Sequence, residues 1–345
     1  MSYQRAIDIV HLRQTDRVGQ QETLAHPAYI QELSGIDPFE HPFEAQVRAL
    51  QRLDVDWVFG IPRHARRFSP GQSSQDGEAG VRHTEWGLTG SSWREEYGFA
   101  DVEAVLAYEP LTALQVDPEP LAGIRTEQQA VGRAMLVTGI FYRTLFQHGI
   151  MTFGWEQFLT AAAAAPDRFQ RVLQDFAEVS RLQLQAMAAQ APPVVLIHDD
   201  IALERGLVFP PDWYRQRLWP LYERLLEPVL SHPGIRVGFV SDGDYSVLLD
   251  DLAVIGFDGF IINDNMDMAG IARRLGQDRF LVGNVSTLVL TDGTVADVRQ
   301  EVRRCLEEAR PCGGHFIKAT RDLPQNIPLD NIRAYFDSVR ELGRR

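Results

Sequence analysis

The chain has 345 residues, of which 45% are hydrophobic and 23% are charged, a composition typical of a globular protein with a large core. Its 47 acidic side chains outnumber its 34 lysines and arginines, which gives a formal net charge of −13. This balance argues against a sequence-independent nucleic-acid binder, because such a protein needs a basic face to displace counterions. Two cysteines, Cys305 and Cys312, imply no disulfide framework and favour reduced thiols in a cytoplasmic protein.

The amino-terminal segment contains no apolar stretch followed by small residues, so we expect no secretion signal. No apolar run approaches the roughly 20 residues that are needed to span a bilayer. We therefore expect no membrane and no nucleic acid among the partners, and a small molecule as the substrate.

The first half of the chain offers three candidate strands. They are Arg17–Gln21, Val55–Ile61 and Met135–Phe141, of which the first is the weakest because its residues have low strand propensity. A polar insertion rich in glycine and serine, residues 63–94, follows the second candidate strand. A loop of this length inside a compact domain is usually functional or disordered.

The end of this insertion carries two aromatic residues, Trp86 and Trp93. Because the insertion follows a strand, we expect it to form a lid over the catalytic end of the fold, with both tryptophans contacting the substrate.

From residue 190 onward, short β-branched runs alternate with amphipathic helical patterns, which is typical of a parallel sheet covered on both faces. With the three earlier candidates the count reaches eight strands, which favours a single-domain (β/α)8 TIM barrel over residues 1–345. The apolar runs are Val194–Ile197, Val237–Val240, Phe260–Ile262, Phe280–Val282 and Phe316–Ile317, and the helical patterns are Asp212–Leu230, Tyr245–Val254, Met268–Leu275 and Val295–Ala309.

The predicted strands end in polar residues, and catalytic groups converge at the carboxyl ends of barrel strands. Converging carboxylates raise one another's pKa or hold a cation. We predict Asp199, Asp200, Asp242 and Arg321 as catalytic residues. The predicted substrate-binding residues, besides the two tryptophans, are Glu22, His198, Asp244, Asn263, Asn284 and Lys318.

Each of these residues also has a structural interpretation. Asp and Asn after strands often cap helices or form turns, and Asp242-Gly243 is a turn dipeptide. Capping is less natural for Asp199 and Asp200, because the next helix begins near Pro211. His198 follows an apolar run and could be a core histidine, and His315 precedes the last strand, so we interpret it as structural.

Several common signatures are missing from the sequence. It contains no dinucleotide-binding G-x-G-x-x-G after a strand, no phosphate-binding loop, no G-x-S-x-G elbow, no C-x-x-C pair and no H-E-x-x-H. These absences disfavour nucleotide-dependent enzymes, serine hydrolases and the common zinc proteases.

The order and spacing of many short motifs resemble the uroporphyrinogen decarboxylase superfamily over nearly the whole chain. The resemblance implies the same (β/α)8 barrel. The motifs lie at Arg5–Val18, Gly149–Val172, His198–Ile201, Gly206, Pro210–Trp213, Ser241–Asp244, Gly256–Gly259, Met266–Ala269, Gly276, Gly283–Val285, Gly313–Phe316, Pro328 and Asn331.

The chain lacks residues that are typical of two branches of this superfamily. The decarboxylases carry an arginine-rich first strand and an aspartate at the end of the second, whereas this chain has Arg17–Glu22 and Phe59–Pro62 in these places. The thiol-activating methyltransferases hold zinc through His-x-Cys and a later Cys, whereas this chain has Val240-Ser241-Asp242 and Arg321 there. Whether Asp242 holds a metal together with His198 or Glu22 stays open, and so does whether that metal is zinc.

The resemblance therefore implies a methyltransferase that demethylates a small methoxy- or methylamine-type compound and passes the methyl group to a corrinoid protein. Asp199 or Asp242 would be the general acid, and Arg321 or Lys318 would stabilise the leaving group. The resemblance also implies a homodimer. A decarboxylase acting on a carboxylated small molecule and a non-catalytic ligand-binding barrel are the alternatives, and the substrate stays open.

Overall fold

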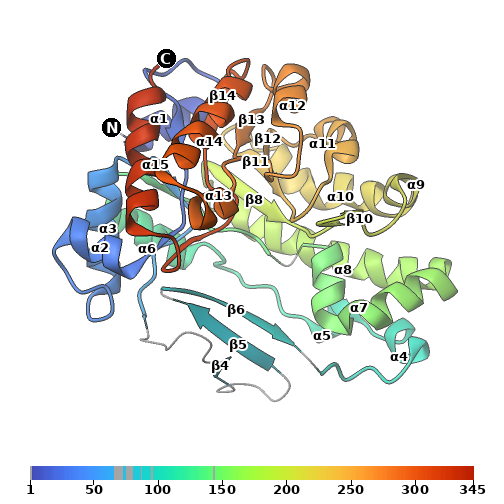
Figure 1. The fold of residues 1–345 in the computed structure, drawn as a ribbon. Helices are drawn as coiled ribbons and strands as arrows, with labels where there is room; N and C mark the ends of the chain where they lie inside the picture. The colour runs from blue at the N-terminus through green and yellow to red at the C-terminus, as the bar shows by residue number, and fades with distance from the viewer. Residues whose placement is uncertain (1, 66–72, 75–80, 87, 95, 143) are drawn as a thin grey trace.

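The computed structural model describes residues 2–65, 73–74, 81–86, 88–94, 96–142 and 144–345, with the side chains of 73–74, 81–86 and 89–93 outside the description. Its centre is a parallel sheet in the spatial order β1-β14-β13-β12-β11-β8 (Figure 1). These strands are β1 (Gly19–Gln20), β8 (Val194–His198), β11 (Arg236–Val240), β12 (Gly259–Ile261), β13 (Phe280–Val282) and β14 (Gly314–Ile317).

A second, separate parallel pair lies beside the sheet. It consists of β3 (Trp57–Val58) and β7 (Leu136–Val137). Isolated parallel bridges join Gln21 to Trp57 and Phe141 to Ile197, so the pair is linked to β1 on one side and to β8 on the other. Each of the eight predicted strands overlaps one of these strands, which confirms an α/β fold with a parallel sheet.

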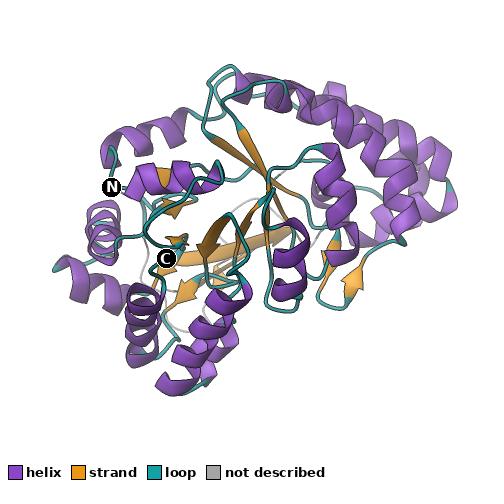
Figure 2. Ribbon diagram, turned by 90° about the horizontal axis from the view of Figure 1, so that it is seen from above, coloured by secondary structure: helices purple, strands orange, loops and turns teal. Residues whose placement is uncertain are grey.

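Helices surround the strands (Figure 2). The four helical patterns predicted in the second half are confirmed by the segment from α9 to α10, by α11, by α12 and by α14. The helices are α1 (Ser2–Val10), α2 (Pro27–Ser34), α3 (Pro42–Leu53), α4 (Val102–Leu106), α5 (Pro110–Ala113), α6 (Ala122–Val131), α7 (Phe146–Ala164), α8 (Pro166–Ala188), α9 (Pro211–Trp213), α10 (Trp219–Leu230), α11 (Leu249–Ile255), α12 (Met268–Leu275), α13 (Thr287–Asp292), α14 (Val295–Glu308) and α15 (Leu329–Leu342). A π-helical turn (Tyr214–Leu218) precedes α10, a 3-10 turn (Ser246–Leu248) precedes α11, and two short pairs complete the fold, β9 (Ala202–Leu203) with β10 (Gly206–Leu207) and β2 (Leu24–Ala25) with β15 (Leu323–Pro324).

Alternate strand residues face two environments, because successive side chains of a strand point to opposite sides. One set packs with α1 into an inner cluster, and the other set packs against the surrounding helices. A Cβ at Gly259 would lie 2.3 Å from the Phe280 ring, so glycine is needed there to make room for this side chain. The inner cluster contains Ala6, Ile9, Val10, Trp57, Leu136, Val194, Leu196, Ile261, Phe280, Val282 and Phe316.

The insertion after β3, predicted as an inserted loop that forms a lid, contains regular strands in its described part. Its described part contains three antiparallel strands, β4 (Ser73–Ser74), β5 (Val81–Trp86) and β6 (Thr89–Arg94). β5 and β6 pair along their whole length, from Val81 with Arg94 to Trp86 with Thr89. In Figure 1 this small sheet lies on the side of the molecule opposite α1 and the two chain ends.

No helix in the described ranges combines the length and the apolar character that a membrane span requires.

Candidate active site

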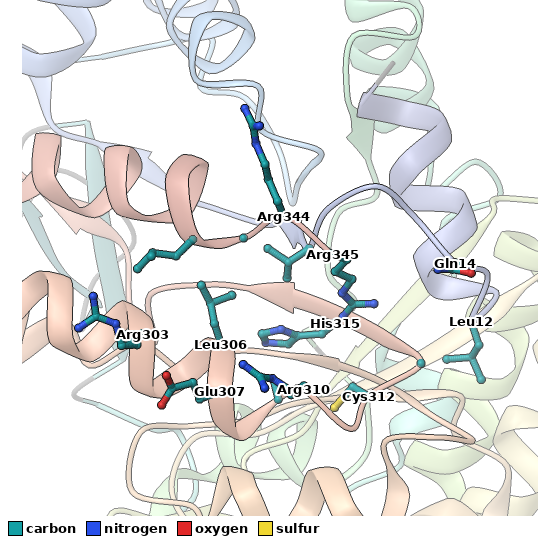
Figure 3. A pocket seen from close by; sticks show the side chains of 15 residues that line it. Leu12, Gln14, Arg303, Leu306, Glu307, Arg310, Cys312, His315, Arg344 and Arg345 are labelled. Atoms are coloured by element: carbon teal, nitrogen blue, oxygen red, sulfur yellow. The ribbon is translucent and has the colours of Figure 1, made fainter.

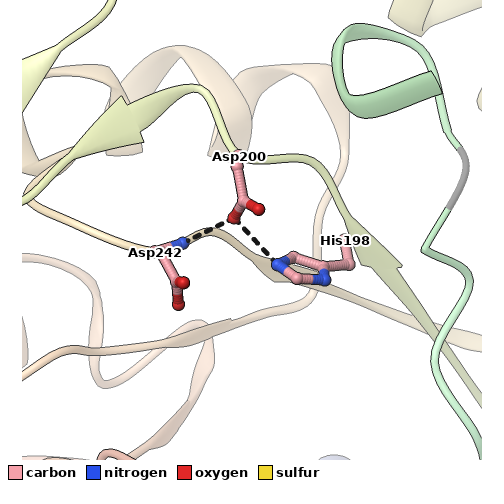
Figure 4. A group of neighbouring side chains, drawn as sticks. All are labelled: His198, Asp200 and Asp242. Carbon is pink, nitrogen blue, oxygen red and sulfur yellow. Dashed lines mark hydrogen bonds and ion pairs between the residues drawn. The ribbon is translucent and has the colours of Figure 1, made fainter. Parts of the chain in front are cut away.

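The predicted site residues of β8 and β11 come together because these strands run parallel and in register. Val240 pairs with His198, so the residues that follow both strands lie side by side. Nε2 of His198 lies 2.8 Å from Oδ1 of Asp200, and the backbone N–H of Asp242 donates to the same oxygen over 2.9 Å (Figure 4). Ligand-type atoms of His198, Asp200 and Asp242 all lie within 4.8 Å of one another.

His198, Asp200 and Asp242, called the trio below, shift one another's pKa. Burial raises the pKa of Asp200, but the hydrogen bond and charge of His198 outweigh burial, so the pKa is lowered. Burial lowers the pKa of His198, but its bond to Asp200 and the nearby carboxylates outweigh this effect and raise it. Burial and the charge of Asp200 raise the pKa of Asp242. The trio therefore combines a hydrogen-bonded imidazole–carboxylate pair with a second carboxyl group whose pKa is raised.

Two cationic residues act on the carboxyl group of Asp242. The charges of Arg321 and Lys318 partly oppose the rise in the pKa of Asp242. Lys318 is buried, and its Nζ donates to the carbonyl of Ala319 over 2.6 Å. Burial lowers the pKa of Lys318, against the charges of Glu22, Asp322 and Asp242. The structure thus places predicted acids and predicted cations at the same strand ends.

Sequence reasoning missed Tyr142 and Gln21. The Tyr142 ring lies edge-on to His198, with 4.5 Å between the ring centroids. Desolvation and the charges of nearby carboxylates raise the pKa of Tyr142 to about 12. Tyr142 follows the predicted strand Met135–Phe141, so its position after a strand was a usable signal. Gln21 is fully buried beside Trp57, and neither polar atom of its amide has a partner among the described residues.

Asp199 lies apart from the trio, although it stands between His198 and Asp200 in the sequence. It is fully buried and accepts hydrogen bonds from the backbone N–H groups of Phe146 (2.9 Å) and Gln147 (2.5 Å) and from the Tyr222 hydroxyl. Burial raises the pKa of Asp199 to about 6. The carboxylate therefore caps α7, a helix that precedes it in the chain, and ties β8 to α10.

Glu22 is not part of the trio. It is buried and accepts a hydrogen bond from the Tyr335 hydroxyl of α15. Burial raises the pKa of Glu22 to about 7, against the lowering effect of the Lys318 charge. Its electrostatic coupling to the site therefore runs through Lys318.

Three further predicted residues hold the loops after the strands. Asp244 accepts hydrogen bonds from the backbone N–H and the hydroxyl of Ser246, as a turn former does. Asn263 donates to the carbonyls of Ser241 and Gly243, at 2.9 and 2.8 Å. Asn284 donates to the Asn263 carbonyl over 3.1 Å. This chain of amides fixes the turn that carries Asp242. The side chains of Trp86 and Trp93 lie outside the described residues.

The donor set bears on which metal the site could hold. The trio offers one imidazole and two carboxylates, a combination that divalent transition metals accept. Both cysteines lie elsewhere, and burial raises the pKa of Cys305 and of Cys312 to about 12, so neither is a ready thiolate. A thiolate zinc site therefore does not fit these residues.

Known proteins resemble this chain in fold and in sequence. A methyltransferase from Methanosarcina mazei has a similar structure, with a TM-score of 0.67 and 18% sequence identity over 99% of this chain and 98% of that one, which is a likeness of fold. The uroporphyrinogen decarboxylase of Gloeobacter violaceus is 27% identical over 183 residues, which are 53% of this chain and 51% of that protein.

A methylcobamide:CoM methyltransferase of Methanosarcina barkeri is 25% identical over 182 residues, 52% of this chain and 50% of its own length. The chain thus spans about half the length of the curated relatives it matches. The family model described as uroporphyrinogen decarboxylase (URO-D) matches residues 144–342, more than half of the chain, and this segment contains the trio, Lys318 and Arg321. The chain therefore belongs to the uroporphyrinogen decarboxylase family, whose matched members include both decarboxylases and methyltransferases.

Proposed function

We propose that this protein is a methyltransferase that removes a methyl group from a small methoxy- or methylamine-type substrate and delivers it to a corrinoid protein. The observation that carries the proposal is the geometry of Asp242 in the trio. Its backbone N–H is bonded to Asp200, and its side chain lies beside His198, where the charge of Asp200 and burial raise its pKa.

A raised pKa suits the main difficulty of such a reaction, which is a poor leaving group. When the methyl–oxygen or methyl–nitrogen bond breaks, its electron pair stays on oxygen or nitrogen. A protonated Asp242 carboxyl can give its proton to that atom and become a carboxylate. His198, with a pKa raised by Asp200, can restore the proton to Asp242.

The cations at the strand ends contribute in a second way. Lys318 and Arg321 act electrostatically on Asp242, so they stabilise the negative charge that forms on it or on the leaving oxygen. Tyr142, whose ring lies against His198, would form a wall of the substrate site. In this proposal Asp199 is a positioning residue, because its carboxylate is already bound by α7 and Tyr222.

The corrinoid carried by the partner protein would supply the nucleophile that accepts the methyl group. We propose that this partner docks at the carboxyl ends of the strands, near the small sheet β4–β6, which would act as the lid. Trp86 and Trp93 stay predicted contacts of the substrate. The trio could also hold a divalent cation, and no step above depends on one.

We also propose that residues 1–345 form one closed eight-stranded barrel. The bridges from Gln21 to Trp57 and from Phe141 to Ile197 support this, because they link the β3–β7 pair to both edges of the sheet. Association as a homodimer stays a prediction.

The proposal is tested by anaerobic incubation of the protein with reduced cobalamin and a panel of methoxyarenes and methylamines. We expect the absorption spectrum of methylcobalamin to develop, and we expect Asp242→Asn to slow it by about 100-fold, as the loss of a general acid does. Asp264→Asn is the matched control, because Asp264 is an exposed aspartate after the neighbouring strand β12. No methylcobalamin with any donor, or equal loss in both variants, would count against methyl transfer by this site.

A decarboxylase is the second candidate, and the position of buried Lys318 favours it. A cation near Asp242 would suit a carboxylated substrate, and curated relatives include decarboxylases. Release of carbon dioxide from carboxylated substrates, without methylcobalamin formation, would identify this activity. No turnover of either kind would favour a ligand-binding barrel.

A further inference from the structure

A cavity of about 660 Å³ lies at the opposite end of β14 from the candidate active site. His315 of β14 lines it, whereas Lys318 follows the other end of this strand. Its walls come from the segment between α1 and β1, from the end of α14 and from the last residues of the chain (Figure 3). A volume of this size accommodates a small organic molecule.

Arginines dominate the charge of this cavity. Arg303, Arg310, Arg344 and Arg345 line it, against one acidic residue, Glu307. None of the ion pairs found among the described residues involves any of these four arginines, although the chain has a net charge of −13. Cations that gather without acidic partners in an acidic protein indicate a site for an anion.

The arginines differ in where they point. In Figure 3, Arg310 and Arg345 lie on either side of His315, whereas Arg344 extends away from the cavity. Burial lowers the pKa of Arg345, and the Arg345 charge opposes the rise in the pKa of Cys312 and adds to the fall in the pKa of His315, so the guanidinium group lies close to both residues. The side chains of Arg310 and Arg345 are both exposed, so an anion can reach them from solvent and pair with either guanidinium group.

His315 adds no competing charge. Burial lowers the pKa of His315 to about 4, and its Nε2 bonds to the Gly283 carbonyl over 2.7 Å, so the ring stays neutral at physiological pH. The remaining walls are mainly apolar, from Leu12, Val18, Leu306 and Leu342. The cavity therefore joins a cationic rim to an apolar interior.

We propose that this cavity binds a small organic anion, with a phosphate or carboxylate head held by Arg310 and Arg345 and an apolar body against Leu306. Guanidinium groups bind both kinds of head through paired hydrogen bonds. The catalytic end of a barrel is the carboxyl end of its strands, so this second site serves binding rather than the reaction.

The test is calorimetric titration of the full chain with 1-naphthyl phosphate, 1-naphthoate and inorganic phosphate at constant ionic strength. We expect one naphthyl compound to bind with one site per chain and inorganic phosphate to bind more weakly, because it lacks the apolar body. The two naphthyl compounds distinguish a phosphate head from a carboxylate head.

The double variant Arg310→Gln/Arg345→Gln should bind at least about tenfold more weakly, because two charge-assisted contacts are lost. Arg273→Gln on α12 removes an exposed arginine outside the cavity lining and should bind as the wild type does. Leu306→Trp, which keeps the arginines but fills the interior, should abolish binding. Wild-type affinity in the double variant, or equal weakening in Arg273→Gln, would overturn the proposal.

A second measurement needs no variant. The bound naphthyl compound should slow the modification of Arg310 and Arg345 by phenylglyoxal, as measured by mass spectrometry of their peptides, while Arg273 reacts at an unchanged rate. Equal modification with and without the compound would contradict the site.

Discussion

The His198–Asp200 hydrogen bond determines how the candidate active site responds to pH. Burial alone would lower the pKa of His198, and the carboxylate of Asp200 reverses this effect. We predict that Asp200→Asn lowers the pKa of His198 below its wild-type value, because the burial remains and the charge is lost. Titration of the imidazole nitrogens by NMR measures the change, and the other histidine signals are the internal control. An unchanged His198 titration would mean that the pair does not form.

The same pair has a consequence for stability. A histidine whose pKa is raised by folding binds its proton more tightly in the folded than in the unfolded state. The stabilisation that His198 contributes to the folded state is complete below the unfolded-chain pKa of about 6.5. It is lost as the pH rises through the folded-state pKa. In Asp200→Asn this pH-dependent part of the unfolding free energy should disappear.

At the scale of elements, Asp199 connects β8 with α7 and α10. Asp199→Ala would leave two backbone N–H groups of α7 and the Tyr222 hydroxyl without their acceptor. We predict a loss of about 3 kcal/mol in the free energy of unfolding, since buried donors are costly to leave unpaired. Urea denaturation measures this loss.

Tyr222→Phe is the matched variant, because it removes one of the three bonds and keeps the carboxylate. It should cost about 1 kcal/mol and leave the chemistry intact. Burial raises the pKa of Asp199 to about 6, above the unfolded value, so its stabilising contribution is present in acid and declines as the pH rises through about 6. Loss of activity in Tyr222→Phe without loss of stability would instead make Asp199 part of the reaction.

At the scale of the whole molecule, the two ends of the chain share one sheet. β1, near the amino terminus, pairs with β14, near the carboxyl terminus, and the bridges at Gln21 and Phe141 connect the remaining strands. We predict one cooperative unfolding transition for residues 1–345, with the same urea midpoint by tryptophan fluorescence and by far-UV circular dichroism. Different midpoints would indicate two independently folding units.

Much of this fold could be predicted from the sequence. Apolar β-branched runs located the strands, because a strand buried on both faces needs apolar residues at successive positions. The alternation of strand side chains could also have separated Asp199 from His198 and Asp200, since neighbours in a strand point to opposite sides. The partner of Asp199 was not predictable, because the α7 amides that it caps lie more than 50 residues earlier in the chain.

The strands of the insertion after β3, in contrast, were not predicted from the sequence. Its glycines and serines favoured a loop, yet its described part pairs into antiparallel strands. Strand pairing depends on contacts between segments, and the amino-acid composition of a segment does not predict these contacts well.

The sequence by itself indicated the family, through the order and spacing of short motifs that resemble it. It also determined the parallel α/β sheet and the polar character of the strand ends, because these depend on residue type and local periodicity. Only the tertiary structure decided which polar groups meet. The register of β8 with β11 brings His198, Asp200 and Asp242 together, and burial gives each of them its shifted pKa. The physical reason is that electrostatic coupling and desolvation depend on distances in space, which the order of residues along the chain does not specify.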